Sequence, residues 1–343
     1  MTSQTSPAAS SPQGGEPLLK ITDLVTRFKT PVGTIDAVAG VNLTIGKGEI
    51  LGLVGESGSG KSVTAMSIMG LIAKPAGSIA NGSIELEGVG DLTRLTDKQM
   101  RTRRGRDVAM TFQDPLSFLN PVYRVGDQII EGLLQHGLVA NRKQGRERAI
   151  ALLKSVNIPF AEKRVDNFPH EFSGGMRQRA LLAVALACQP RLLICDEVTT
   201  ALDVVTQYEV LLMLRRLVDE TGLSIVFVTH DLGVAAALCD RIAVMYAGRV
   251  MEVGPAGEIL GNPSNPYTRA LMETVPRFDI VAKRLRTIEG STPSLYSPPP
   301  GCRFHPRCSL ATDICRQQTP ALENVAASHL SACHYRQTGT SLS

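Results

Sequence analysis

The sequence predicts an α/β protein in which strands alternate with helices, followed by a cysteine-rich C-terminal extension at residues 276–343. Three features support this prediction. Short runs of β-branched and aliphatic residues alternate with longer helix-forming stretches, a pattern typical of a sheet with helical crossovers. A glycine-rich segment at residues 55–62 lies between one such run and a helix-forming stretch. Four of the seven cysteines lie close to the C-terminus, from Cys302 to Cys333.

Length, net charge and apolar content limit the classes of protein to which this chain can belong. The 343 residues suffice for one large domain with an appendage, or for two domains. The net charge of only +4 does not favour a nucleic-acid partner. No apolar run approaches the ~18–20 residues that span a bilayer. Residues 1–17 lack the basic start and apolar stretch of a signal peptide and are expected to form a disordered tail. The chain is therefore expected in the cytoplasm, where it would reach a membrane only through a partner.

The elements follow in order along the chain. Strands are expected at residues 18–28, 37–45, 50–54, 83–87, 107–112, 192–195, 224–228 and 241–245. Helices are expected at residues 61–72, 125–156 with a break near Gly137, 174–188 and 204–220, with a short helix after the strand at 224–228. The helical stretch at about 115–180 predicts an inserted subdomain. The proline-rich segment at 276–300 predicts a linker or an irregular wrap.

The segment at residues 55–62 fits G-x-x-x-x-G-K-S, the pattern of a phosphate-binding loop, and has the required strand before it and helix after it. Its glycines let backbone N–H groups turn toward phosphates, and the helix N-terminus favours negative charge. Lys61 is expected to reach the β- and γ-phosphates and Ser62 to bind Mg²⁺. The predicted ATP-binding residues here are Gly55, Glu56, Ser57, Gly58, Ser59, Gly60, Lys61, Ser62 and Val63.

An apolar strand at residues 192–195 is followed directly by Asp196 and Glu197. A carboxylate at the end of a buried parallel strand suits a Mg²⁺ ligand, so Asp196 is expected to hold the metal, mostly through water. Glu197 is expected to act as general base on the attacking water. Alone this pair is a weak signal, because an acid at a strand end often caps the next helix. Together with the phosphate loop it predicts ATP hydrolysis.

Residues 172–179, Phe-Ser-Gly-Gly-Met-Arg-Gln-Arg, resemble the signature motif of the ABC ATPases. Further positions match that family in order: Phe28 resembles the aromatic residue that stacks on adenine, Gln113 the Q-loop glutamine, Asp203 the D-loop aspartate and His230 the switch histidine. The resemblance covers roughly residues 18–275. Two positions depart from the pattern, Val198 in place of proline and Met176 in place of glutamine, and neither removes a functional group.

This resemblance implies a P-loop NTPase core with a mixed sheet. It implies that ATP lies between the phosphate loop of one subunit and Ser173, Gly174 and Gly175 of another. Gln113 would bind Mg²⁺ and move the helical subdomain, and His230 would contact the γ-phosphate. ATP would thereby hold two subunits together until hydrolysis releases them.

A narrower resemblance is to ATPase subunits of oligopeptide and dipeptide importers. It rests on Asn-Pro-Tyr-Thr-Arg-Ala-Leu at residues 265–271, on residues 112–115 and on the cysteine-containing tail. It implies partnership with two membrane permease subunits, a second ATPase subunit that is a paralogue, and indirectly a periplasmic or extracellular peptide-binding protein. The implied location is the cytoplasmic face of the bacterial inner membrane. Importers of glutathione or nickel, and a non-transport ABC ATPase, remain alternatives.

The tail cysteines Cys302, Cys308, Cys315 and Cys333 are spaced C-x5-C-x6-C-x17-C. In a reducing compartment such a group indicates metal rather than disulfides. Zinc sites usually contain a closer C-x2–4-C pair, which is absent here. Thiolate ligation at wider spacing suits an iron–sulfur cluster, and the importer family is described with a 4Fe-4S cluster in this region. Zinc and free thiols remain the alternatives.

Overall fold

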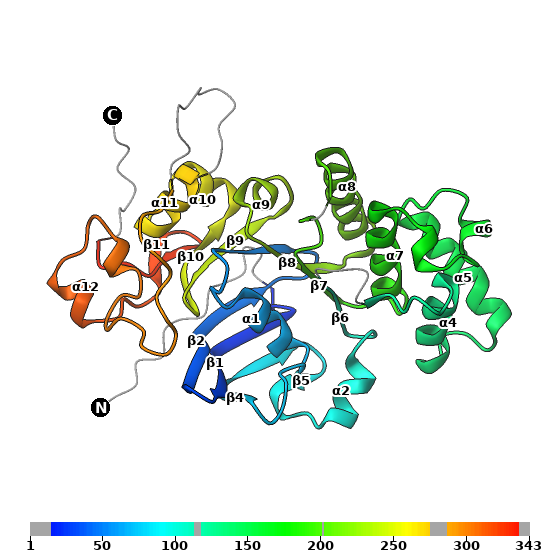
Figure 1. Cartoon of the computed structure of the whole chain (residues 1–343), viewed down its shortest axis with the longest axis horizontal. Coiled ribbons are helices and arrows are strands. Elements are labelled where there is room, and N and C mark those ends of the chain that lie inside the picture. Colours follow the sequence, from blue (N-terminus) through cyan, green and yellow to red (C-terminus); the bar gives the residue numbers. More distant parts are fainter. Residues whose placement is uncertain (1–14, 113–117, 201, 275–286, 336–343) are drawn as a thin grey trace. The chain divides into compact units, whose positions relative to one another are not determined.

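The computed structural model describes residues 15–112, 118–200, 202–274 and 287–335. The described chain forms two compact units, coloured along the sequence in Figure 1. The first unit comprises Met1–Arg94 and Val228–Ser343, and the second comprises Leu95–Phe227. The predicted tail at residues 1–17 lies almost wholly outside the described residues.

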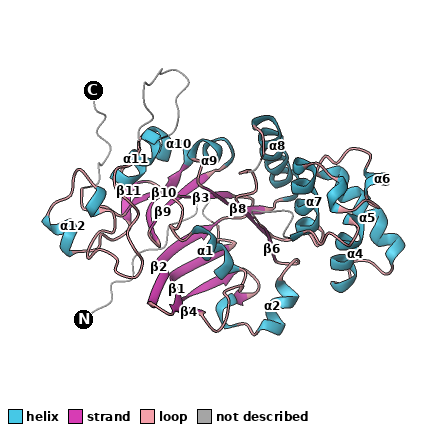
Figure 2. Ribbon diagram, viewed as in Figure 1, coloured by secondary structure: helices cyan, strands magenta, loops and turns pink. Residues whose placement is uncertain are grey.

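The first unit contains a four-stranded antiparallel sheet with the order β2-β1-β4-β5. Its strands, drawn in magenta in Figure 2, are β1 (Leu19–Thr30), β2 (Gly33–Ile45), β4 (Gly77–Leu86) and β5 (Gly90–Asp91). Alternate residues of β1, such as Leu19 and Ile21, are buried, as expected for a strand with one face on a core. Phe28 of β1 lies opposite Ile35 of β2 and Gly77 of β4.

A second sheet of the first unit has the order β11-β12-β10-β9-β3. These strands are β3 (Ile50–Val54), β9 (Arg241–Tyr246), β10 (Arg249–Pro255), β11 (Glu323–Ala326) and β12 (His329–Ser331). β3 and β9 are parallel and fully buried, which agrees with the apolar sequence of β3 and of β9 after Arg241. The pairing of β12 with β10 is antiparallel, so the C-terminal extension adds two strands to this sheet.

A buried ion pair fixes the start of β9. Arg241, 1% exposed, donates from Nη1 to Glu49 Oε1 at 2.9 Å and to the Thr44 carbonyl at 3.3 Å. Glu49 immediately precedes β3, which ends at the phosphate loop, so the pair joins both strands of the parallel ladder. The helices of the first unit are α1 (Lys61–Ile68), α9 (Leu232–Leu238), α10 (Ala256–Gly261), α11 (Pro266–Thr274) and α12 (Asp313–Gln317), with short 3-10 turns at Leu92–Arg94 and His305–Arg307.

The second unit contains the parallel pair β6 (Val108–Thr111) and β7 (Leu192–Asp196), with β8 (Ser224–Thr229) next to β7. The last two residues of β8 belong to the first unit. The helices are α2 (Asp97–Arg103), α4 (Val125–Gln135), α5 (Arg142–Ser155), α6 (Ala161–Arg164), α7 (Gly174–Leu186) and α8 (Val204–Thr221), with a 3-10 turn at Pro169–Glu171. α4, α5 and α7 pack on one another through buried residues such as Ile129, Leu153 and Leu181.

The structure confirms the predicted alternation of strands with helices and the mixed sheet. It also confirms the predicted break near Gly137, which separates α4 from α5. The first helix ends at Ile68 rather than residue 72, because Gly70 takes a left-handed conformation with φ of 61° and the Leu71 N–H bonds back to Met66. Within the described residues, no helix has the length and apolar character needed to cross a membrane.

Candidate functional site

The phosphate loop connects β3 to α1 as the sequence predicted, and close packing explains two of its glycines. A Cβ on Gly55 would lie 2.1 Å from the Met245 carbonyl oxygen, and a Cβ on Gly60 would lie 2.6 Å from the Ala37 carbonyl oxygen. Gly60 also has φ of 102°, in the left-handed region that favours glycine. Any side chain at either position would force the loop off the strands beneath it.

Lys61 is 5% exposed, and its ammonium group lies within the loop itself. Nζ donates to the carbonyl oxygens of Gly55 at 2.8 Å and Glu56 at 3.0 Å, and lies 3.5 Å from Ser59 Oγ. The Ser59 carbonyl accepts from the Gly248 N–H in the β9–β10 turn at 2.8 Å. A buried cation held among backbone carbonyls at the start of a helix suits an incoming phosphate.

Glu56 of the loop contacts residues far away in the sequence. Its carboxylate accepts two hydrogen bonds from Arg307, at 2.7 and 3.0 Å, and its N–H donates to the hydroxyl of Tyr267 at 3.1 Å. Tyr267 belongs to α11 and Arg307 to the C-terminal extension. The sequence predicted Glu56 as a nucleotide-binding residue but gave no signal for either contact, because a separation of 251 residues leaves no local pattern to read.

Within the loop and α1, Ser57 and Gly58 are exposed, and Ser62 and Val63 are half-buried. Outside the loop, the predicted residues of the first unit are His230 and Phe28. His230 is exposed and directly follows β8, where Asp231 caps α9 by accepting from the N–H groups of Gly233 and Val234. Phe28 is half-buried, and its ring packs against the backbone of Gly77, where an added Cβ would lie 2.8 Å from Phe28 Cε1. Both side chains therefore retain some surface for a ligand.

In the second unit, β7 ends in Asp196, which is 8% exposed. Glu197 follows with φ of 50°, an uncommon conformation for a residue that is not glycine. Its carbonyl accepts from the Thr200 N–H at 3.3 Å, so the chain turns sharply at this point. Backbone strain of this kind occurs at functional sites, where it aims a side chain in a fixed direction. Val198 is fully buried behind it.

The signature residues lie at the start of α7. Ser173 caps this helix by accepting from the Met176 N–H at 3.3 Å, and both Ser173 and Gly174 are exposed. Asp203 caps α8 through Thr206, whose N–H and hydroxyl hold the pKa of the Asp203 carboxyl below its usual range. A Cβ on Gly175 would lie 2.6 Å from Thr206 Cγ2, so the two helix starts pack closely. The predicted Gln113 lies outside the described residues.

The predicted metal site at the tail cysteines is wrong. Cys302, Cys308, Cys315 and Cys333 border a common cavity of about 20 Å³, but among the described residues no group of three or more His, Cys, Asp or Glu side chains could hold a metal ion. Neither the iron–sulfur cluster nor the zinc alternative is therefore supported. None of the four is joined in a disulfide within the described part of the chain.

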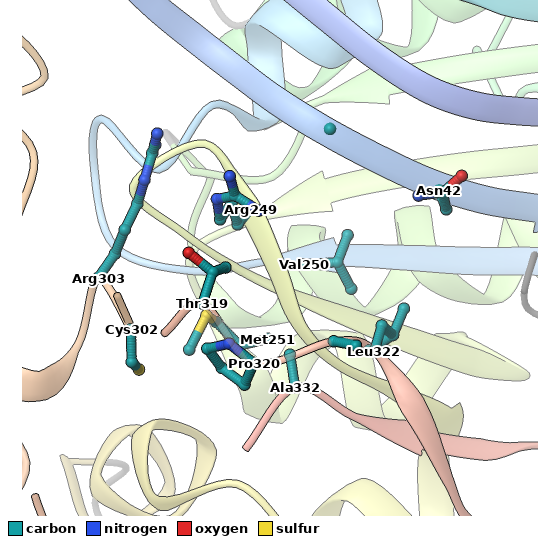
Figure 3. Close-up of a pocket in the computed structure, with 12 residues that line it drawn as sticks. Asn42, Arg249, Val250, Met251, Cys302, Arg303, Thr319, Pro320, Leu322 and Ala332 are labelled. Atoms are coloured by element: carbon teal, nitrogen blue, oxygen red, sulfur yellow. The ribbon is translucent and has the colours of Figure 1, made fainter. Parts of the chain in front are cut away.

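The placement of these side chains gives a physical reason for the correction. Spacing along the chain does not determine whether sulfur atoms converge on one point, and within the described residues the four thiols form no group that could hold a metal ion. Burial raises the pKa of the Cys302 thiol to about 11 and also raises that of Cys308, so both thiols are protonated at neutral pH. Cys302 also borders a second cavity, of about 70 Å³, beside Arg249 and Arg303 (Figure 3). The extension is held instead by strand pairing and by Arg307.

Comparisons with known proteins agree with this geometry. A family model described as ABC transporter matches residues 38–200, and one described as oligopeptide/dipeptide transporter, C-terminal region, matches residues 251–315. The ATP-binding cassette MJ0796, solved as a dimer in a post-hydrolysis state with ADP and phosphate, is 28% identical with a TM-score of 0.62, and the match covers 69% of this chain and 98% of that one. The fold and the phosphate loop thus define an ABC-type ATPase, an enzyme that hydrolyses ATP.

Similarity extends over nearly the whole chain among peptide-transport proteins. The dipeptide transport ATP-binding protein DppD of Bacillus subtilis is 44% identical over 93% of this chain and 94% of its own length. The oligopeptide transport ATP-binding protein OppD of the same organism is 47% identical over 91% and 87%. OppD of Salmonella typhimurium is 44% identical over 95% and 96%. The chain belongs to this family of ATP-binding subunits of oligopeptide and dipeptide transporters.

Proposed function

We propose that this chain hydrolyses ATP to power the import of dipeptides or oligopeptides through a membrane ABC transporter. The observation that carries the proposal is the near full-length similarity to peptide-transport subunits, which includes the region after the ATPase core. A complete phosphate loop with a buried Lys61 supports the ATPase part. Import of glutathione or nickel by a related transporter is the second candidate.

ATP binding is assigned first to the phosphate loop. The N–H groups at the start of α1 would donate to the phosphates. Lys61 Nζ, held by the Gly55 and Glu56 carbonyls, would direct its remaining N–H to the β- and γ-phosphates. Phe28, half-buried on β1, would stack on the adenine ring. These interactions bind and orient the nucleotide before any bond breaks.

A second subunit would complete the site. The exposed Ser173 and the N–H groups of Gly174 and Gly175 lie at the start of a 13-residue helix, where a phosphate is favoured by both hydrogen bonds and the helix dipole. Asp203 would lie at the same subunit interface. The related cassette MJ0796 is dimeric with ADP and phosphate, which supports this arrangement. We expect the second subunit to be a paralogue.

Mg²⁺ is assigned to the Ser62 hydroxyl, the Asp196 carboxylate and Gln113. The Ser62 and Asp196 side chains offer oxygen donors, which Mg²⁺ prefers, and Asp196 ends a buried strand as such a ligand would. Bound there, Mg²⁺ would neutralise charge on the phosphates. Glu197 would take a proton from the attacking water, and His230 would donate to the γ-phosphate.

Two permease subunits would carry the solute, and a peptide-binding protein would deliver it. The chain would act at the cytoplasmic face of the inner membrane, where ATP is available. Because an ATPase subunit does not touch its cargo, the solute is best identified in the assembled transporter.

The test is reconstitution of that transporter in vesicles, with ATP supplied to this chain and labelled solutes on the other side. We expect uptake of dipeptides or oligopeptides to depend on ATP and to vanish in Lys61→Ala. Lys163→Ala is the matched control, because Lys163 is exposed in α6 and outside every predicted site. Uptake of glutathione or nickel without peptide uptake would favour the second candidate, and no ATP-dependent uptake would reject both.

A further inference from the structure

Every polar group of Glu56 is engaged by another part of the first unit. The carboxylate accepts from Arg307 Nη1 at 2.7 Å and Nη2 at 3.0 Å, and the N–H donates to the Tyr267 hydroxyl at 3.1 Å. The carbonyl accepts from Lys61 Nζ at 3.0 Å. Glu56 therefore forms a continuous polar connection between the C-terminal extension and the lysine of the phosphate loop.

Arg307 uses all five of its N–H donors. Besides the two bonds to Glu56, Nη1 donates to the Tyr246 hydroxyl at 3.2 Å, Nη2 to the Ile288 carbonyl at 3.1 Å and Nε to the Glu289 carbonyl at 2.9 Å. Its side chain is only 6% exposed, and that of Glu56 is 24% exposed. A bidentate pair between a guanidinium and a carboxylate in such surroundings fixes orientation as well as charge.

Aromatic packing fixes the positions of the two residues that hydrogen-bond to Glu56, Arg307 and Tyr267. Tyr246, Tyr267 and Phe304 form an aromatic cluster whose ring centroids lie 4.6–5.3 Å apart. The Arg307 guanidinium lies 5.7 Å from the centre of the Tyr246 ring. Tyr267 is fully buried, so its hydroxyl holds the Glu56 N–H at a fixed position. The aromatic cluster thus supports both the Tyr267 hydroxyl and the Arg307 guanidinium, which hydrogen-bond to Glu56.

The negative charge of Glu56 gives its pairing with Arg307 a role in nucleotide binding. A free carboxylate in the second position of a phosphate loop would repel a triphosphate, and Arg307 neutralises it. The hydrogen bonds that Arg307 donates to Glu56 are also the main cause that raises the pKa of Arg307, so the guanidinium stays charged. The same pairing holds the peptide whose carbonyl receives Lys61.

We propose that Arg307 is a positioning residue for ATP binding, which acts through Glu56 on Lys61 and makes the C-terminal extension part of the phosphate-loop support. The inference rests on the proposed function, since it assigns a partner to the same ATP site. It gives the extension, which carries no metal site among the described residues, a role in the ATPase cycle.

The experiment uses the full-length chain and measures the Kd for ATP together with the melting temperature. Arg307→Met keeps the apolar stem but removes the charge and all five donors. We expect the Kd for ATP to rise about 5- to 50-fold, in the range of ordinary coupling between sites. Arg316→Met is the matched control, because Arg316 lies in the same extension, pairs with Asp313 and is 58% exposed.

A double variant separates positioning from general damage to the fold. In Arg307→Met the Glu56 carboxylate is left unneutralised beside the phosphates, so adding Glu56→Gln should recover about threefold or more of the lost affinity. A purely structural role predicts no such recovery. If Arg307→Met does not fold, Arg307→Lys tests the positioning role instead. Lysine keeps the positive charge but cannot form the two parallel hydrogen bonds to the Glu56 carboxylate, so the Kd for ATP should still rise at least about threefold.

The inference is overturned if the Kd of the folded Arg307 variant stays within about twofold of the parent, or if the two substitutions act independently. Its failure is distinct from that of the proposed function. A parent chain that binds ATP and loses binding in Lys61→Ala, while Arg307→Met binds normally, rejects only the positioning role. A parent chain that does not bind ATP, or is unaffected by Lys61→Ala, rejects the proposed ATP site itself.

Discussion

The carboxylate of Glu252 on β10 lies 2.8 Å from Nε2 of His329 on β12, and both side chains are buried. The same carboxylate accepts from the N–H groups of Ser264 at 2.6 Å and Asn265 at 3.3 Å. One buried acid therefore joins the ATPase core, the loop before α11 and the C-terminal extension. This satisfies the requirement that a buried charge be paired and hydrogen-bonded.

We expect Glu252→Ala to lower the free energy of unfolding by about 3–5 kcal/mol, because it removes one partner of a buried pair and leaves two N–H groups without acceptors. Denaturation by urea measures this change. Limited proteolysis should also cut the extension faster, since β12 loses its anchor. Glu258→Ala is the matched control, because Glu258 is exposed in α10, and its effect should stay within about 0.5 kcal/mol. Equal effects of the two substitutions would show that Glu252 is not an anchor.

Substitution by alanine should have opposite effects at Gly60 of the phosphate loop and at Gly257 of α10. Gly60→Ala places a Cβ 2.6 Å from the Ala37 carbonyl oxygen in a left-handed conformation, so we expect a loss of about 1–3 kcal/mol in stability and of most ATP affinity. Gly257→Ala in α10 meets nothing within 4 Å and should stabilise the chain by about 0.4–1 kcal/mol. Melting curves and ATP titrations measure both variants. Normal ATP binding by Gly60→Ala would mean that the loop tolerates displacement from β2.

The part of the site that the sequence predicted is the part encoded locally. Strand β3, the phosphate loop and α1 follow one another, and the strand that ends in Asp196 is a continuous apolar run. Such patterns report directly on backbone conformation and burial. The cap residues Ser173 and Asp203 likewise lie immediately before the helices whose N–H groups they accept from.

The parts that could not be predicted depend on contacts between distant residues. Arg307 and Glu56 are 251 residues apart, and Glu252 and His329 are 77 apart. In each pair, the sequence around one residue does not indicate which distant residue is its partner. The predicted metal site at the tail cysteines is wrong for a related reason. The spacing of four cysteines along the chain does not determine whether their sulfur atoms converge, and within the described residues they form no group that could hold a metal ion.

A buried thiol should make stability depend on alkaline pH. Burial, with a smaller contribution from the Asp196 charge, raises the pKa of Cys195 to about 12 from 9.0, against a hydrogen bond from Thr111 that lowers it. Between about pH 9 and pH 12 the unfolded chain loses this proton before the folded chain does, so the free energy of unfolding falls by up to about 1.4 kcal/mol per pH unit. Below about pH 9 the contribution is complete.

Comparison with Cys195→Ala isolates this effect from other groups that titrate in the same range. The variant is destabilised by its lost packing, but it lacks the thiol. We therefore expect the difference in unfolding free energy between parent and variant to shrink as pH rises above about 9. Urea denaturation at several alkaline pH values measures it. A constant difference would mean that Cys195 ionises equally in the folded and unfolded chains.

Glu197 turns out of β7 with φ of 50°, and this constrained turn supports its assignment as general base. Glu197→Gln keeps the size of the side chain but removes the proton acceptor, so the assembled transporter should bind ATP with parental affinity and lose about 10²- to 10⁴-fold in turnover. Single-turnover assays should find intact ATP retained on the variant. Glu220→Gln, at an exposed position near the end of α8, is the control and should leave the rate unchanged. Hydrolysis by Glu197→Gln at the parental rate would assign the base to another residue, because no other change in the variant affects proton transfer.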